Sequence, residues 1–253
     1  MDSNARQITS GTPLASAANK VEILRDQDEA YLQRHYPFYF AYNAGLSKLQ
    51  ISFKSPVART WPLYFGYTQL MFWALRDDSK PFSDLTYNPE LFYRQKLVGW
   101  GLVKSIDLGI LNHTSNGRDG SESRSFDRAH LKLNFEKEFS RWIMSFHVQW
   151  SVLYDIEDGN SDIRDYISPL AVGVSTVQLF DSWVDKSELA LQLIPGGRKG
   201  QEISSGGYQA SWSFRLGGLD VVPAFYLQYY HGYAETLLNY HSRVDVFRVG
   251  FIF

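Results

Sequence analysis

From Tyr36 to the C-terminus, apolar and polar residues alternate along the chain with a period of two. Successive side chains of a β-strand point to opposite faces, so this alternation predicts strands with one apolar and one polar face. The pattern is clearest over residues 141–152, where one set of alternate positions is apolar or aromatic: Trp142, Met144, Phe146, Val148, Trp150 and Val152. A chain with this period over most of its length is expected to be all-β.

Turn-forming residues divide the segment into about twelve strands, an even number. Most of them approach the roughly 9 to 11 residues that a tilted strand needs to cross a membrane. The expected strands are 36–43, 48–57, 62–75, 87–98, 102–112, 124–137, 141–153, 165–179, 187–194, 207–216, 221–233 and 242–253.

The composition favours a membrane over water as the medium around these strands. The chain holds 17 Phe, 16 Tyr and 7 Trp, and aromatic residues are enriched in strands and at membrane interfaces. A soluble β-sandwich also alternates, but its strands are usually shorter. Closure into a barrel satisfies every backbone polar group within lipid. We therefore expect an antiparallel transmembrane β-barrel over residues 36–253, preceded by a polar segment, residues 1–35, to which we assign no chemistry.

Alternate connections between the expected strands are long and polar, and those between them are short. The long ones are 76–86, 116–123, 154–164, 195–206 and 233–241. Barrels of the bacterial outer membrane have this asymmetry, with long extracellular loops and tight periplasmic turns. The chain is thus predicted to be a multi-pass outer-membrane protein. Its 25 Lys and Arg against 27 Asp and Glu offer no basic surplus, so we expect no nucleic-acid partner.

One short segment carries three side chains that could perform catalysis. His113 and Ser115 are two residues apart, so in a strand they share a face. If the chain reverses symmetrically about Gly120, Asp127 lies opposite His113 on the next strand. A serine hydroxyl becomes a good nucleophile when an imidazole takes its proton and a carboxylate orients that imidazole. The spacing predicts a Ser-His-Asp triad, although ordinary turn chemistry is the alternative for an isolated His-x-Ser.

The triad is expected on the outer, lipid-facing wall of the barrel. Asp127 shares its face with the apolar residues Ala129, Leu131, Leu133 and Phe135. His113 and Ser115, however, have the opposite parity to the apolar residues Ile106, Leu108 and Ile110. A β-bulge between Gly109 and Asn112 would turn them outward. Catalytic groups at that position would be suited to hydrolysing lipids.

The motif Asn112-His113-Thr114-Ser115-Asn116-Gly117-Arg118, followed by Ser123-Arg124-Ser125, resembles the signature of the bacterial outer-membrane phospholipase A family. Further matches are residues 67–69, 87–92, 158–163 and 232–240. The resemblance runs from about Tyr36 to the C-terminus. It implies a twelve-stranded barrel and a calcium-dependent enzyme that hydrolyses acyl esters of outer-membrane phospholipids and is active as a homodimer.

The resemblance also implies roles for individual residues. Ser115 matches the nucleophile, His113 the base, and Gly117 the residue whose backbone N–H helps to stabilise the oxyanion. Gln69 matches a buried polar residue that supports the third member of the triad. Asp127 stands where many relatives have Asn, and a carboxylate there would both orient and stabilise the imidazolium.

Calcium ligands are implied in the same way. They are the backbone carbonyl of Arg118, the hydroxyl of Ser123, and the backbone carbonyl of Ser79 of the partner subunit. Oxygen ligands suit this hard cation, which can polarise an ester carbonyl. Some relatives carry an acidic residue at the position of Gly120, so a second site in the monomer would need Asp119, Glu122 or Asp158. The alternative function is a passive pore or structural barrel, which explains the alternation but not the outward triad.

Overall fold

The computed structural model describes residues 31–178, 184–196, 206–216 and 223–253. The strands in these ranges are β1 (Gln33–Arg34), β2 (Tyr39–Tyr42), β3 (Ser47–Pro56), β4 (Leu63–Trp73), β5 (Phe82–Lys96), β6 (Val103–Ser115), β7 (Ser125–Glu138), β8 (Ile143–Tyr154), β9 (Leu170–Val177), β10 (Asp185–Ile194), β11 (Gly207–Arg215), β12 (Ala224–Gly232) and β13 (Val244–Ile252). Three short 3-10 helices are η1 (Gly120–Glu122), η2 (Asp158–Asn160) and η3 (Ile163–Asp165).

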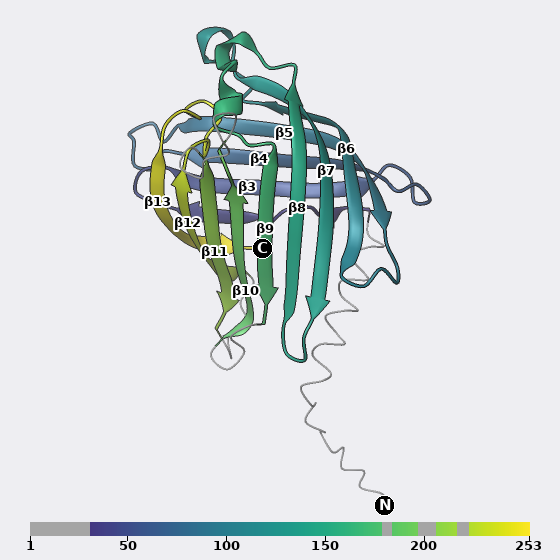
Figure 1. Ribbon diagram of the computed structural model, residues 1–253. Coiled ribbons are helices and arrows are strands. Elements are labelled where there is room, and N and C mark those ends of the chain that lie inside the picture. The colour runs from purple at the N-terminus through teal and green to yellow at the C-terminus, as the bar shows by residue number, and fades with distance from the viewer. Residues whose placement is uncertain (1–30, 179–183, 197–205, 217–222) are drawn as a thin grey trace, which may run out of the picture.

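The strands form one closed antiparallel barrel (Figure 1). Each strand from β2 to β13 pairs with its neighbours in the chain, and β13 pairs with β2 to close the cylinder. The short β1 also pairs with β3, beyond the residues that β2 occupies, so β1 and β2 share one position in the barrel. In the described residues this gives twelve strand positions, which confirms the predicted fold class.

Several strand ends differ from those expected. Strand β5 begins at Phe82 and not at 87, because residues 82–86 continue the pairing with β4, with Phe82 opposite Trp73. The buried Asp84 of this stretch accepts a hydrogen bond from the backbone of Leu238. Strand β9 begins at Leu170 and not at 165, because the preceding residues form η3. Pairing starts at Gln33, slightly before the expected boundary. The expected strand residues 179 and 221–222, and the loop residues 197–205, lie outside the described residues.

The two faces of the barrel have inverted polarity compared with a water-soluble protein. Large apolar side chains are exposed on the outer wall, among them Leu131, Trp150, Leu191, Phe247 and Phe251. Polar and charged side chains are buried inside, among them Lys48, Glu90, Asp107, Gln228 and Arg248. An apolar exterior around a polar interior is the arrangement of a barrel in lipid. The described residues include no helix long and apolar enough to span a membrane.

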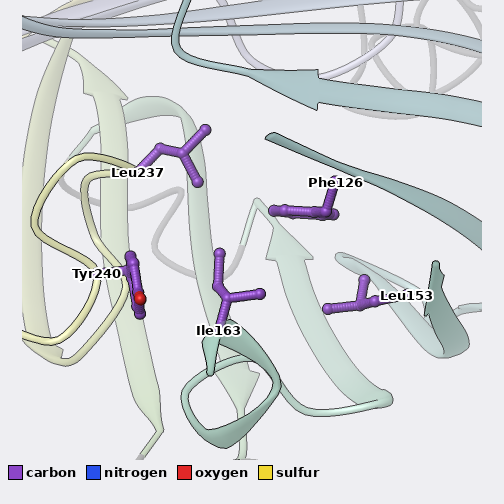
Figure 2. Close-up of a cluster of buried hydrophobic side chains, with 5 residues drawn as sticks. All are labelled: Phe126, Leu153, Ile163, Leu237 and Tyr240. Atoms are coloured by element: carbon purple, nitrogen blue, oxygen red, sulfur yellow. The ribbon is translucent and has the colours of Figure 1, made fainter. Parts of the chain in front are cut away.

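At the loop end, an apolar cluster joins two loops to the inner wall. We call Phe126, Leu153, Ile163, Leu237 and Tyr240 the mouth cluster. Figure 2 shows these side chains converging from β7, β8, η3 and the β12–β13 loop. Burial, reinforced by a hydrogen bond to Asp162, raises the pKa of the Tyr240 hydroxyl, so this hydroxyl stays protonated and donates to Asp162. The mouth cluster therefore anchors the β8–β9 and β12–β13 loops beside the first residues of β7.

Candidate active site

A β-bulge near the end of β6 sets which side chains face lipid. Ile110 and Leu111 are adjacent yet both exposed, at 47% and 59%, where a regular strand would bury one of them. The register shifts between Gly109 and His113 on the β7 side, and at the facing position on the β5 side, which gives β6 one extra residue. Side-chain parity therefore reverses, and His113 and Ser115 point outward. The bulge inferred from the sequence is confirmed.

His113 and Asp127 form the centre of the site. They are direct cross-strand partners, as expected from reversal about Gly120, which has φ +64°. Nδ1 of His113 lies 2.7 Å from Oδ1 of Asp127, with the two side chains 55% and 24% exposed. An ionised carboxylate can only accept a hydrogen bond, so we assign the imidazole proton to Nδ1. Nε2 of His113 then carries the free lone pair that a general base needs.

Ser115 and Gly117 complete the outward part of the site. The N–H of Gly117 donates a hydrogen bond to Oγ of Ser115 over 3.1 Å. Gly117 has φ +64°, and a Cβ there would lie 2.8 Å from Cε2 of Tyr87, so a glycine suits the position. Within the described residues, Ser115 and His113 are not hydrogen-bonded to each other. Catalytic hydrogen bonds are often long without substrate and shorten when it binds.

Gln69 lies on β4, separated by two strands from β7 and its Asp127. Its side chain accepts a hydrogen bond from the hydroxyl of Tyr67 over 3.1 Å. It pairs across the strands with Tyr87, which in turn pairs with Ser115. In the described residues Gln69 and Asp127 are not hydrogen-bonded to each other, and the supporting role of Gln69 stays a prediction.

The loop after β6 is organised by Asn116, whose role the sequence analysis missed. This amide is almost fully buried. Its Oδ1 accepts hydrogen bonds from the N–H groups of Arg118 and Arg124, at 3.3 and 3.0 Å, and its Nδ2 donates to the carbonyl of Glu122 at 2.7 Å. An Asn bonding to the backbone two residues on is a recognised turn signal. The amide thus shapes the loop that carries the expected calcium ligands.

The residues expected to bind calcium fit that ion in chemical type. The Arg118 guanidinium is bonded to the Ser83 carbonyl and the Glu122 carboxylate, which ties the loop to β5. The Ser123 hydroxyl donates to Oε2 of Glu157 over 2.8 Å, so the loop presents oxygen atoms, as a hard cation requires. Ser79 is exposed in the β4–β5 connection.

The three acidic residues that a second calcium site would need, Asp119, Glu122 and Asp158, do not form a cluster with one another among the described residues. Glu122 is paired with Arg118, and Asp119 and Asp158 are exposed. In the part of the chain that the structure describes, no three His, Cys, Asp or Glu residues form a group able to hold a metal. Glu157, beside Ser123, was not anticipated from the sequence.

Comparison with known proteins identifies the family. The family model described as phospholipase A1 matches residues 21–253, nearly the whole chain. The chain belongs to the phospholipase A1 family. This match includes the bulge, the His113–Asp127 pair and the loop that follows Ser115.

Curated members of the phospholipase A1 family align with most of the barrel. The phospholipase A1 of Salmonella typhimurium is 29% identical over 198 residues, and that of Escherichia coli K12 is 28% identical over 198 residues. Each alignment covers 72% of this chain and 59% of the relative. This chain therefore spans less than two thirds of the length of these relatives.

Solved structures share the barrel fold. The outer membrane phospholipase A of Escherichia coli superposes with a TM-score of 0.71 at 22% identity, covering 91% of this chain and 96% of that one. An outer membrane phospholipase dimer of Salmonella typhi with bound calcium gives a TM-score of 0.69 at 23% identity, covering 87% and 91%. Together with its apolar outer wall, membership of the phospholipase A1 family assigns this chain to the outer membrane as a multi-pass barrel.

Proposed function

We propose that this chain is a calcium-dependent outer-membrane phospholipase that hydrolyses phospholipid acyl esters with Ser115, His113 and Asp127 and is active as a homodimer. The observation that carries the proposal is the 2.7 Å contact between His113 and Asp127 on the lipid-facing wall, with Ser115 on the same face. Ionisable groups on such a wall are costly and therefore point to function. Their position near the ends of β6 and β7 suits lipid ester groups at the membrane interface.

The proposed reaction follows from the roles of the three side chains. Oγ of Ser115 attacks the ester carbonyl carbon while Nε2 of His113 takes the hydroxyl proton. The carbon–oxygen ester bond breaks, His113 returns that proton to the departing lysolipid alcohol, and the acyl group remains on Ser115. Water then attacks the acyl-enzyme, giving its proton to His113, and the fatty acid leaves as Ser115 regains a proton. Asp127 stabilises the imidazolium in both halves.

The developing oxyanion needs hydrogen-bond donors or positive charge. The Gly117 N–H, 3.1 Å from Oγ of Ser115, is close enough to the nucleophile to supply one donor. The Arg118 carbonyl and the Ser123 hydroxyl would hold calcium, together with the carbonyl of Ser79 of the partner subunit. Bound calcium supplies positive charge that polarises the ester carbonyl.

A homodimer is supported by the incomplete ligand set and by the outer wall. One chain presents few oxygen ligands, whereas Ca²⁺ takes six to eight. Exposed apolar side chains such as Leu111 and Trp150 belong to a wall that a second barrel could cover within the membrane. The Salmonella typhi relative is a dimer with bound calcium.

The side chains inside the barrel do not favour the alternative function of a passive pore. Ion pairs such as Arg94 with Asp107 and Arg248 with Glu235 occupy it, and the mouth cluster packs at its loop end. A water-filled channel would require an open lumen. We therefore favour the enzyme.

Replacing the nucleophile tests the proposal. Ser115→Ala should abolish hydrolysis of phospholipid in mixed micelles and leave a folded, heat-modifiable barrel, since it removes one hydroxyl near a strand end. A sulfonyl fluoride should label the wild type at Ser115. The matched variant is Ser121→Ala, an exposed serine of the adjoining loop, which should retain both turnover and labelling. Undiminished turnover by Ser115→Ala would refute the assignment.

A further inference from the structure

The carboxylate of Glu157 reaches the active site from a different loop. Its Oε2 accepts hydrogen bonds from the hydroxyls of Ser123, at 2.8 Å, and Ser125, at 3.2 Å. Ser125 is the direct cross-strand partner of Ser115. The carboxylate therefore lies between an expected calcium ligand and the strand pair that carries the nucleophile.

Buried contacts hold Glu157 in this place. Its own N–H donates to the Ser125 carbonyl over 3.1 Å. The fully buried Asn160 bonds to both backbone groups of Ser125, at 3.1 and 3.3 Å. A Cβ at Gly159 would lie 2.9 Å from the Ser123 carbonyl, so the two loops approach as closely as a glycine allows. Ile163, a few residues on, is part of the mouth cluster (Figure 2).

The hydrogen-bond partners of this carboxylate carry no charge. Among the described residues they are two serine hydroxyls and not a lysine or arginine. The nearby Arg124 guanidinium donates instead to the carbonyls of Ser121 and Ser123, at 2.8 and 2.6 Å. A carboxylate that accepts hydrogen bonds only from hydroxyls keeps lone pairs on its oxygens, with which it can bind a metal ion.

We propose that Glu157 is a calcium ligand in this chain, acting together with Ser123 and the Arg118 carbonyl. The inference rests on the proposed calcium dependence and adds the one charged ligand to it. Two oxygens 2.8 Å apart can both coordinate an ion that binds oxygen at 2.3–2.6 Å. Because ligand charge raises calcium affinity, the monomer then binds calcium before a second subunit adds its carbonyl.

The test measures calcium binding directly, by isothermal titration calorimetry of the full chain kept monomeric in detergent. Glu157→Gln keeps the size and an oxygen that can accept from both serines. Loss of a group that only hydrogen-bonds to a metal ligand typically weakens metal binding 10- to 100-fold, so loss of a direct charged ligand should weaken it about tenfold or more. Heat modifiability on gels checks that the variant folds.

The control is Asp155→Asn, which removes the same charge from the same loop. Asp155 is exposed and has φ +45°, a conformation that Asn also tolerates. Its calcium affinity should stay near that of the wild type. Equal losses in the two variants would mean that overall loop charge, and not ligation, attracts the ion, and would overturn the inference.

The remaining outcomes separate this inference from the proposed function. Unchanged affinity in Glu157→Gln, with calcium still required for hydrolysis, overturns the role of Glu157 and leaves the enzyme intact. A wild-type monomer that binds no calcium, while the active dimer needs it, also overturns the inference. Wild-type hydrolysis in a calcium chelator would instead contradict the calcium dependence itself.

Discussion

Asp127 shows how much one side chain contributes to the proposed site. Its carboxylate accepts from Nδ1 of His113 over 2.7 Å, which both orients the ring and stabilises its protonated form. In Asp127→Asn the amide oxygen can still accept from Nδ1, so only the charge is lost. In Asp127→Ala the ring also loses its orientation. Orientation and charge are separable effects at this position.

We predict a modest loss of kcat in Asp127→Asn and a larger one, about 100-fold or more, in Asp127→Ala, the range typical of general-base catalysis. Steady-state hydrolysis of a short-chain phospholipid in micelles measures both. KM should change little, because in the proposed reaction Asp127 acts on His113, and the imidazolium that it stabilises forms only during the chemical step. Equal activity in the Ala variant and the wild type would show that Asp127 does not assist His113.

At the scale of elements, the bulge in β6 decides whether the proposed site faces outward. One extra residue reverses parity, because side chains in a strand alternate with a period of two. Gly109, at the base of the bulge, allows the close approach of His130: a Cβ there would lie 2.2 Å from Cε1 of that ring.

Deleting Ile110 should remove the extra residue and restore regular pairing, with His113 still opposite Asp127. Leu111 then takes the outward place of Ile110, and alternation from Leu111 keeps His113 and Ser115 on the lipid side. We predict that the deletion variant folds and keeps both hydrolysis and sulfonyl labelling at Ser115. Ile110→Ala, which keeps the residue count at a position exposed to lipid, is the control. Loss of labelling in a folded deletion variant would contradict the parity mechanism.

At the scale of the whole molecule, calcium and dimerisation should be linked. A ligand whose site is completed by the second subunit must stabilise the dimer. Chelation should therefore suppress hydrolysis and shift the protein toward monomer, with strand content by circular dichroism unchanged. Analytical ultracentrifugation with calcium or chelator measures the shift. Full activity in a chelated, monomeric sample would reject the linkage.

Closure of the barrel depends on a buried charge network across the interior. Arg248 of β13 and Lys48 of β3 both pair with Glu235 of the β12–β13 loop, the Lys48 contact being 3.6 Å. Glu235→Gln leaves two buried cations without a carboxylate, which should cost about 3–5 kcal/mol of unfolding free energy. Urea unfolding followed by tryptophan fluorescence measures it. The exposed Glu138→Gln is the control and should be near neutral.

The sequence by itself determined most of the strands, the inverted barrel and the shared outward face of His113 and Ser115, with Asp127 opposite His113. All of these follow from local periodicity: alternation sets the faces, and equal spacing on either side of Gly120 sets His113 opposite Asp127. Even the bulge was visible, as a conflict of parity before His113. The family resemblance added the expected calcium loop, which the chain carries in one contiguous stretch.

Only the tertiary structure decided what depends on contacts between distant segments. The first residues of β5 pair with the end of β4, and the buried Asp84 among them bonds to the backbone of Leu238, far along the chain, which no local pattern reveals. Gln69 is separated from Asp127 by two intervening strands, a distance set by barrel order. Glu157 meets Ser123 because the mouth cluster and Asn160 dock one loop onto another. Contacts of this kind depend on how the loops pack on the closed barrel, and periodicity along the chain carries no information about them.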